Sequence, residues 1–185
     1  MSLTSYDLCG PNPNPMTVAE VDALKSLLDP RVIIEHPVFI QIGAERGVST
    51  IAMLEARYDA FIFSIDIGEC PGEAENLRKA NMDYRKVVRV LGKSWDIAQY
   101  WPYPCDFLFI DGDHSEEGVK RDIIGWLPVV KKGGIVAFHD YIPEPIPPEI
   151  KGRVVYAVDS LMEKFGSALA ETAQSAGYWK LTGMP

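Results

Sequence analysis

Short apolar runs recur along the chain, separated by segments in which apolar residues return every three or four positions. Such runs favour buried strands, whereas the three- or four-residue spacing is typical of amphipathic helices. Strands are predicted at 38–42, 61–65, 87–91, 107–110 and 135–138. Helices are predicted at about 17–28, 48–57, 94–99 and 115–127, with a Glu-rich helix ending near Ala80. The alternation predicts an α/β fold: a doubly wound, Rossmann-like, mostly parallel sheet with helices on both faces.

The N-terminal end of the chain departs from this alternation. Residues 1–16 include Pro11, Pro13 and Pro15 and are predicted to form an irregular arm, because proline restricts the backbone and lacks an amide donor. Thr17 followed by Glu20 predicts a capping box at the start of the first helix.

The sequence patterns that predict the C-terminal elements are weaker. After the Pro-rich stretch 143–148, a helix is predicted at about 152–165. Strands near 168–174 and 177–182 are close enough in sequence to form a terminal antiparallel hairpin, which completes an expected seven-stranded sheet. No internal repeat or second boundary interrupts residues 17–185, which are predicted to be a single domain.

Composition narrows the classes of function. The formal net charge of −8 and the lack of a Lys/Arg run argue against sequence-independent nucleic-acid binding. The apolar runs are too short to cross a membrane, and the N-terminus does not resemble a signal peptide. Cys9, Cys70 and Cys105 lack CxxC spacing, so they are predicted to be reduced thiols in a cytoplasmic protein. The oligomeric state is left open, a homo-oligomer included.

The strongest functional signal lies between Phe107 and Tyr141, where two apolar runs each end abruptly in polar residues. The first run stops at Asp111-Gly112-Asp113-His114 and the second at His139-Asp140. The intervening helix is predicted to extend to Val130 and to end at Gly133-Gly134. Adjacent parallel strands lie about 4.8 Å apart, so both polar clusters are expected to converge at the sheet edge where ligands bind.

A second signal points to a nucleoside-containing ligand. The first strand runs into Gly43-x-x-x-Gly47, which opens a helix and lets the backbone approach a ligand closely. The second strand ends at Asp66, a position suited to accept hydrogen bonds from ribose hydroxyls. The glycine spacing differs from GxGxxG, which weakens the case for a nicotinamide dinucleotide.

These motifs resemble those of the class I S-adenosylmethionine-dependent methyltransferases, and more narrowly the small-molecule O-methyltransferases of the group that includes macrolide-sugar and aminocoumarin-sugar methyltransferases. The resemblance spans about Val38 to Asp159 and is most specific in IDGDHSEEGVKRDIIGWLPVVKKGGIVAFHDY. IGAERGVST and GKSWDIA match two further segments of that group. It implies S-adenosylmethionine as cofactor and a small-molecule methyl acceptor: a sugar, a phenol or another hydroxylated natural product.

The resemblance also implies site residues. The cofactor would be bound by the glycine loop, the end of the second strand, the G-x-S segment and Asp111. These residues are Gln41, Gly43, Ala44, Gly47, Ser49, Asp66, Ile67, Gly92, Ser94, Trp95 and Asp111. Gln41 stands where the superfamily usually has an acidic residue facing the methionine ammonium, so the hydrogen bond is kept and the charge is lost.

The two polar clusters contain the predicted metal ligands and catalytic residues. Asp111, His139 and Asp140 are predicted to hold a divalent metal, Mg²⁺ or Mn²⁺, that would acidify the acceptor hydroxyl. A histidine ligand also admits Fe²⁺ or Zn²⁺. His114 and Asp111 are the predicted catalytic residues, with His114 in the position of a general base.

Several alternatives stay open on sequence alone. Asp111 and Asp140 could cap helices or turns, His114 could cap the helix that follows it, and His139 could be an inert core residue. For the whole chain, the alternatives to a methyltransferase are a catalytically silent nucleoside-binding domain and a nicotinamide-dependent oxidoreductase. The identity of the methyl acceptor does not follow from the sequence.

Overall fold

A computed structural model describes residues 2–9, 16–29, 36–141, 153–162, 168–173 and 176–180. Five parallel strands form the body of the sheet: β1 (Val38–Ile42), β2 (Phe61–Asp66), β3 (Val87–Leu91), β4 (Cys105–Ile110) and β5 (Val130–Phe138). Beyond β5 the sheet continues with β7 (Ala176–Lys180) and β6 (Ala168–Ala173), each antiparallel to its neighbour. The strand order is β3-β2-β1-β4-β5-β7-β6.

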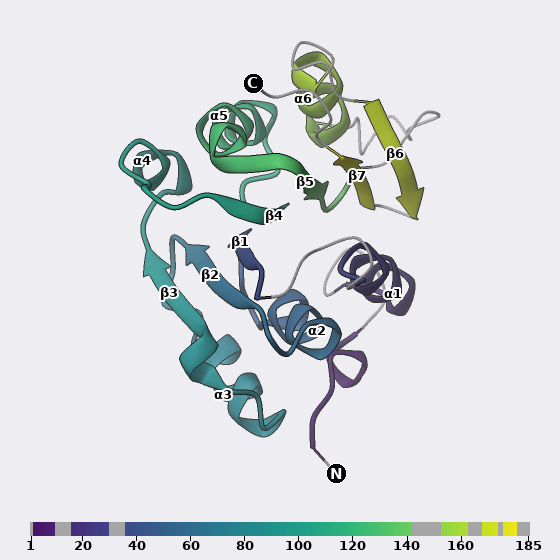
Figure 1. Ribbon diagram of the computed structural model, residues 1–185, viewed down its shortest axis with the longest axis vertical. Helices are drawn as coiled ribbons and strands as arrows, with labels where there is room; N and C mark the ends of the chain where they lie inside the picture. The colour runs from purple at the N-terminus through teal and green to yellow at the C-terminus, as the bar shows by residue number, and fades with distance from the viewer. Residues whose placement is uncertain are drawn as a thin grey trace.

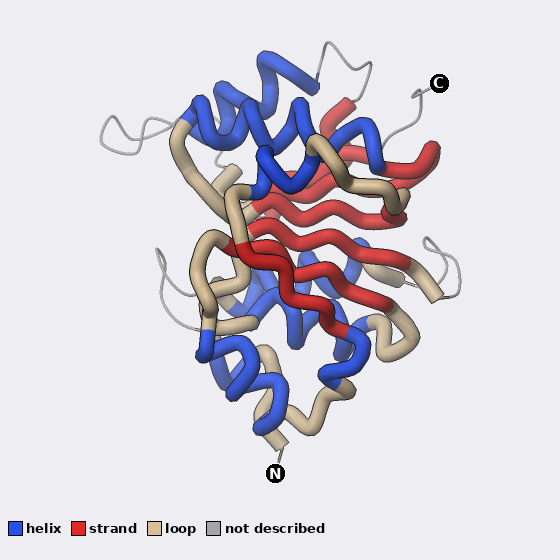
Figure 2. Tube along the Cα trace, turned by 90° about the vertical axis from the view of Figure 1, so that its left-hand side faces the viewer, coloured by secondary structure: helices blue, strands red, loops and turns tan. Residues whose placement is uncertain are grey.

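Helices cover both faces of the sheet, as predicted (Figures 1 and 2). One face carries α1 (Val18–Leu27), α2 (Val48–Ala56) and α3 (Pro71–Lys79), and the other carries α4 (Ser94–Ala98), α5 (Glu116–Trp126) and α6 (Arg153–Met162). Short 3₁₀ turns lie at Tyr6–Leu8, Tyr84–Lys86 and Leu127–Val129. In the described residues, no helix has the length and apolar character that a membrane crossing needs.

Strand periodicity divides the core into two clusters. Successive side chains of a strand point to opposite faces. In the fully buried strand β4, Phe107 and Phe109 therefore pack toward α1 and α2, whereas Leu108 and Ile110 pack toward α5 and α6. Cys105, at the start of this strand, is also completely buried.

The strand order places a topological switch between β1 and β4. After β1 the chain winds outward through β2 to β3, and it then returns to the other side of β1 as β4. The connections on the two sides leave the carboxyl ends of β1 and β4 in opposite directions, which opens a crevice there. The crevice lies at Ile42–Gly43 and Ile110–Asp111, where both of the predicted signals are located.

The predicted end of the helix before β5 is wrong. Helix α5 ends at Trp126, a 3₁₀ turn containing Pro128 follows, and β5 already begins at Val130. The pair Gly133-Gly134 lies inside β5, where the pairing register with β4 shifts between Cys105 and Phe107. Glycine suits this irregularity, because Gly133 has a φ of 80° and a Cβ at Gly134 would lie 3.0 Å from the Asp106 carbonyl oxygen.

Other boundaries differ by one or two residues from the predicted ones, as helix and strand ends commonly do. The exception is β5, which begins at Val130 and not at Ile135. Of the predicted C-terminal elements, residues 152, 163–165, 174 and 181–182 lie outside the described residues.

Candidate functional site

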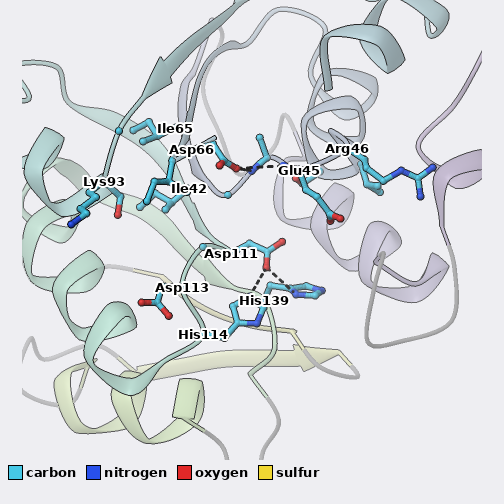
Figure 3. A pocket seen from close by; sticks show the side chains of 18 of the residues that line it. Ile42, Glu45, Arg46, Ile65, Asp66, Lys93, Asp111, Asp113, His114 and His139 are labelled. Carbon is cyan, nitrogen blue, oxygen red and sulfur yellow. Dashed lines mark hydrogen bonds and ion pairs between the residues drawn. The ribbon is translucent and has the colours of Figure 1, made fainter. Parts of the chain in front are cut away.

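A cavity of about 480 Å³ opens at the carboxyl ends of β1, β2, β4 and β5 (Figure 3). That volume is in the range of pockets that bind small molecules and cofactors. Its walls come from the turns after these strands, from the turn after β3 and from Met16, which lies two residues before α1. They comprise Met16, Ile42–Arg46, Val48, Ser49, Ile65–Ile67, Gly92–Trp95, Asp111–His114 and His139.

The glycine loop between β1 and α2 forms one wall of this cavity. Gly43 has a φ of 85°, and a Cβ there would lie 1.9 Å from the carbonyl oxygen of Asp111. A side chain at this position would therefore force apart the two strand ends that border the cavity. Gly47, the residue before α2, has a φ of 77°, and a Cβ there would lie 2.9 Å from Cγ of Glu73. It does not line the cavity, so its glycine is explained by conformation and packing and not by cofactor contact.

Asp66 fastens the end of β2 to this loop. Its Oδ2 accepts a hydrogen bond from the Ala44 amide at 2.8 Å, and its Oδ1 accepts one from the Gly68 amide at 2.9 Å. Burial opposes ionisation, but the amide donors outweigh it and hold the pKa of Asp66 below its ordinary value. The carboxylate is therefore charged at neutral pH and lies in the cavity wall, where a ribose acceptor was predicted.

Gln41 is not in the cavity wall, contrary to the expectation from the family resemblance. Strand alternation directs Ile42 toward the cavity and Gln41 to the opposite face, where it is fully buried. Its amide oxygen accepts a hydrogen bond from the Ser49 hydroxyl at 3.0 Å, and its amide nitrogen donates to Thr50 Oγ1 at 3.0 Å. Gln41 thus reaches the cavity only through Ser49, which does line it.

A buried carboxylate behind Gln41 was missed by the sequence analysis. Glu73 of α3 is completely buried and accepts hydrogen bonds from Thr50 at 2.6 Å and Ser64 at 2.7 Å. Arg89 of β3 lies 2.9 Å from its second oxygen. The spacing to Leu77, one turn later on the same buried side of α3, was the available signal.

The far wall is built from the turn between β3 and α4. Ser94, the first residue of α4, is buried and donates to the carboxylate of Asp122 on α5. Burial of that carboxyl raises the pKa of Asp122 to about 6. Arg121 and Lys93 lie over the Trp95 ring, 5.4 and 6.0 Å from its centroid.

The two predicted polar clusters meet at the cavity wall, where Figure 3 shows Asp111, His114 and His139 beside one another. Asp111 Oδ1 lies 3.3 Å from Nε2 of His114 and 3.1 Å from Nδ1 of His139. Asp140 lies behind them, with one oxygen 2.8 Å from Nδ1 of His114 and the other 3.5 Å from Nδ1 of His139. Glu20 of α1 approaches from the opposite side, 3.5 Å from Nε2 of His139.

The electrostatics of this cluster favour cations. Contacts with Asp111 and Asp140 raise the pKa of His114 to about 10. Burial works against a charged His139, but contacts with Asp111, Asp140 and Glu20 prevail and raise its pKa to about 12. For Asp140, burial is likewise outweighed by the two histidines, and its pKa is lowered. Three carboxylates surround two imidazoles, so the cluster holds positive charge strongly.

The geometry decides among the alternative roles for these residues. His114 does not cap α5, because the Ser115 hydroxyl accepts the hydrogen bond from the Gly118 amide at 3.0 Å. Within the part of the chain that the structure describes, no backbone amide donates to Asp111 or Asp140, so neither acts as a cap there.

The predicted metal-ligand set needs one correction. The residues whose ligand atoms lie within 4.8 Å of one another are Asp111, His114 and His139. Asp140, predicted as a ligand, instead contacts the far nitrogen of His114, and its side chain does not line the cavity. The backbone of Asp140 explains why its side chain does not line the cavity. Its φ of 52° is left-handed, so the chain turns directly after His139.

Comparison with known proteins shows which protein family this chain belongs to. Residues 40–141 match the model of a family described as "Methyltransferase domain". The chain is 30% identical over 112 residues to an uncharacterised protein of Acanthamoeba polyphaga mimivirus; the aligned part is 56% of this chain and 51% of that protein. The chain therefore spans about half the length of this curated relative.

Solved structures share the fold. The O-methyltransferase TomG from Streptomyces achromogenes, in complex with S-adenosylmethionine, aligns with a TM-score of 0.69 at 18% identity, over 96% of this chain and 83% of TomG. An O-methyltransferase from Bacillus cereus, in complex with S-adenosylhomocysteine, aligns with a TM-score of 0.70 at 16% identity, over 91% and 83% of the two chains. Both have the Rossmann-like sheet described above.

Proposed function

Because this chain belongs to the Methyltransferase domain family, we propose that it transfers the methyl group of S-adenosylmethionine to a hydroxyl of a small molecule. One observation carries the proposal: a single cavity joins a nucleoside-type half, built from the glycine loop and Asp66, to a cluster of histidines and carboxylates. The cofactor's sulfonium supplies an electrophilic methyl group when it is bound. The residues of the chain must then align the acceptor oxygen and manage its proton.

We assign the cofactor to the wall opposite His139. The loop Gly43–Ala44 and Ser49 would face the methionine part, and Asp66 with Ile67 the ribose, because a carboxylate accepts from both ribose hydroxyls. Gly92, Ser94 and Trp95 would flank the adenine. Asp111 lies between these groups and the histidines, so it borders both the cofactor and the acceptor. Gln41 and Gly47 support this wall without touching the cofactor.

A divalent cation fits the cluster of Asp111, His114 and His139. Neither ring nitrogen of the buried His139 makes a hydrogen bond of ordinary geometry, although both face carboxylate oxygens. One carboxylate and two imidazoles form a nitrogen-rich set, which suits Mn²⁺, Fe²⁺ or Zn²⁺ better than Mg²⁺. Such a cation would bind the acceptor hydroxyl and lower its pKa. Mn²⁺ therefore becomes the preferred candidate over Mg²⁺.

The same geometry favours His114 as a ligand over His114 as a free base. A ligand atom of His114 lies within 4.8 Å of those of Asp111 and His139, and its Nδ1 contacts Asp140 at 2.8 Å, which leaves Nε2 for a cation shared by the three residues. Asp140 would hold the ring with Nε2 toward the cation. The base role predicted from sequence remains the competing proposal.

We further propose that residues 17–185 act as one catalytic domain and that the arm 1–16 contributes to the acceptor side, because Met16 lines the cavity.

The acceptor is proposed to be a sugar, phenol or other hydroxylated small molecule. The acidic composition supports a partner other than nucleic acid, and the unpaired cysteines support a reducing compartment such as the cytoplasm.

Calorimetric titration tests the cofactor assignment. S-adenosylmethionine and S-adenosylhomocysteine are expected to bind one per chain, and NAD is expected not to bind. Binding of NAD alone would favour the oxidoreductase, and binding of none of the three would refute the assignment. A screen of hydroxylated acceptors with Mn²⁺, and again with excess chelator, then separates a silent cofactor-binding domain from an active transferase.

A further inference from the structure

Glu20 lies on α1, far in sequence from the strand ends that carry Asp111 and His139, yet its carboxylate reaches the same cluster. The residue is only 2% exposed, and Oε1 lies 3.5 Å from Nε2 of His139. His139 is itself 5% exposed, and its Nδ1 lies 3.1 Å from Asp111. The imidazole therefore lies between Glu20 at Nε2 and the carboxylates of Asp111 and Asp140 at Nδ1.

Helix capping accounts for only one oxygen of Glu20. Oε2 accepts hydrogen bonds from the Thr17 amide at 2.7 Å and from the Thr17 hydroxyl at 2.9 Å, which forms the predicted capping box. A cap alone does not require Oε1 to leave water, and removing an ionised carboxylate from water costs free energy. The position of Oε1 beside His139 thus points to a second role at that ring.

The two oxygens of the Glu20 carboxylate have different neighbours: Oε2 accepts from Thr17, and Oε1 faces Nε2 of His139. An ionised carboxylate accepts hydrogen bonds and does not donate them. Oε1 can therefore contact His139 favourably only when Nε2 carries a hydrogen.

We propose that Glu20 is the positioning residue of His139: it accepts the Nε2–H hydrogen bond and so presents Nδ1 to a divalent cation at Asp111. The inference rests on the proposed metal site. A histidine that binds a metal usually donates its other N–H to a carboxylate or carbonyl, which fixes the tautomer and strengthens the ligand. Helix α1 is thereby part of the site, although Glu20 itself does not line the cavity.

The chain offers a matched pair of variants to test this. Glutamine still completes a capping box, so Glu20→Gln keeps the helix start and removes the charge beside His139. Thr17→Ala does the reverse, because it removes the cap hydroxyl and leaves the carboxylate. The measurement is the Mn²⁺ dissociation constant from calorimetry, together with the melting temperature of the metal-free protein and the affinity for S-adenosylhomocysteine.

Glu20→Gln is expected to weaken Mn²⁺ binding by about 10- to 100-fold, the usual effect of losing the partner of a metal-bound histidine. Its metal-free melting temperature and its affinity for S-adenosylhomocysteine should stay close to those of the unaltered protein. Thr17→Ala is expected to melt earlier and to bind Mn²⁺ normally.

Three outcomes would overturn the inference, and they differ from one another. Equal Mn²⁺ affinity in Glu20→Gln and the unaltered protein removes Glu20 from the site and leaves the proposed metal site standing. A Glu20→Gln protein that melts well below Thr17→Ala shows that the glutamate acts through folding. An unaltered protein that binds neither Mn²⁺, Fe²⁺ nor Zn²⁺ rejects the metal site as well, while its affinity for S-adenosylhomocysteine reports on the cofactor proposal separately.

Discussion

The carboxylate of Asp66 has two roles at the scale of a single residue. Its two oxygens accept the amides of Ala44 and Gly68, so it shapes the glycine loop. It also borders the cavity, where the proposed ribose would lie. Loss of the side chain should therefore affect both the shape of the loop and the affinity for the cofactor.

We predict that Asp66→Ala weakens binding of S-adenosylhomocysteine by roughly 1.5–3 kcal/mol, the range for hydrogen bonds to a charged group. Asp66→Asn keeps one acceptor oxygen and should lose less. Calorimetric titration of the three proteins measures the effect. Identical affinities would remove Asp66 from the cofactor site.

His114 separates two accounts of proton removal. As a ligand, it supports metal binding and turnover together, so His114→Ala should weaken Mn²⁺ binding by at least about tenfold and lower kcat/KM as well. As a free base, its loss should cost about 10²–10⁴ in kcat/KM and leave Mn²⁺ affinity unchanged. Calorimetry and steady-state rates on this one variant distinguish the two, and normal metal affinity would contradict the ligand assignment.

Asp122 gives a prediction about pH. Burial raises its pKa from 3.8 to about 6, so the folded state binds its proton more tightly than the unfolded state does. The stability from this group is complete below pH 3.8 and is lost as pH rises through about 6. The loss amounts to roughly 3 kcal/mol, at about 1.4 kcal/mol per pKa unit.

Asp122→Asn removes this titration and keeps an acceptor for Ser94. The difference in unfolding free energy between pH 4.5 and pH 8, from urea denaturation, should therefore shift in favour of pH 8 in the variant. A pH dependence identical to that of the unaltered protein would show that Asp122 ionises freely in the fold.

At the scale of elements, helix α3 is tied to the sheet through a buried charge. Glu73 accepts from Thr50 of α2 and Ser64 of β2, and it pairs with Arg89 of β3. Helical periodicity was enough to predict α3, but not to show which of its glutamates faces inward. That depends on α2 and β2, which place the hydroxyls of Thr50 and Ser64 beside the Glu73 carboxylate.

Glu73→Ala should lower the free energy of unfolding by about 3–5 kcal/mol, the typical cost of removing one partner of a buried ion pair. Glu75→Gln is the matched control, because Glu75 pairs with Lys79 on the exposed side of the same helix. That variant should melt like the unaltered protein. Equal effects in chemical denaturation would mean that the buried network does not stabilise the fold.

The elements also show why some predictions failed. Apolar runs and helical spacing were sufficient for β1, β2 and α2, whose boundaries match within one residue. Gly133-Gly134 was taken as a helix end, which is the usual local meaning of such a pair. Its actual role in β5 depends on Asp106 and Cys105 of the neighbouring strand, so no local pattern could have revealed it.

At the scale of the whole molecule, topology brings the site together. Parallel strands end at one edge of the sheet, so Asp66, Asp111 and His139 could be placed near one another from sequence alone. Glu20 could not be placed at the site from sequence, because α1 precedes β1 in the chain. Only in the folded protein does α1 lie over the strand ends. The prediction that Gln41 contacts the cofactor rested on its position in the motif. Strand alternation turns its side chain away from the cavity instead.

The central claim is that one cavity holds both S-adenosylmethionine and a divalent cation beside it. A crystal structure of the protein grown with S-adenosylhomocysteine and Mn²⁺, with anomalous data collected for manganese, tests this most directly. We predict the nucleoside beside Asp66 and an anomalous peak bound by Asp111, His114 and His139. Cofactor density outside this cavity, or no manganese peak among these three residues, would contradict the account.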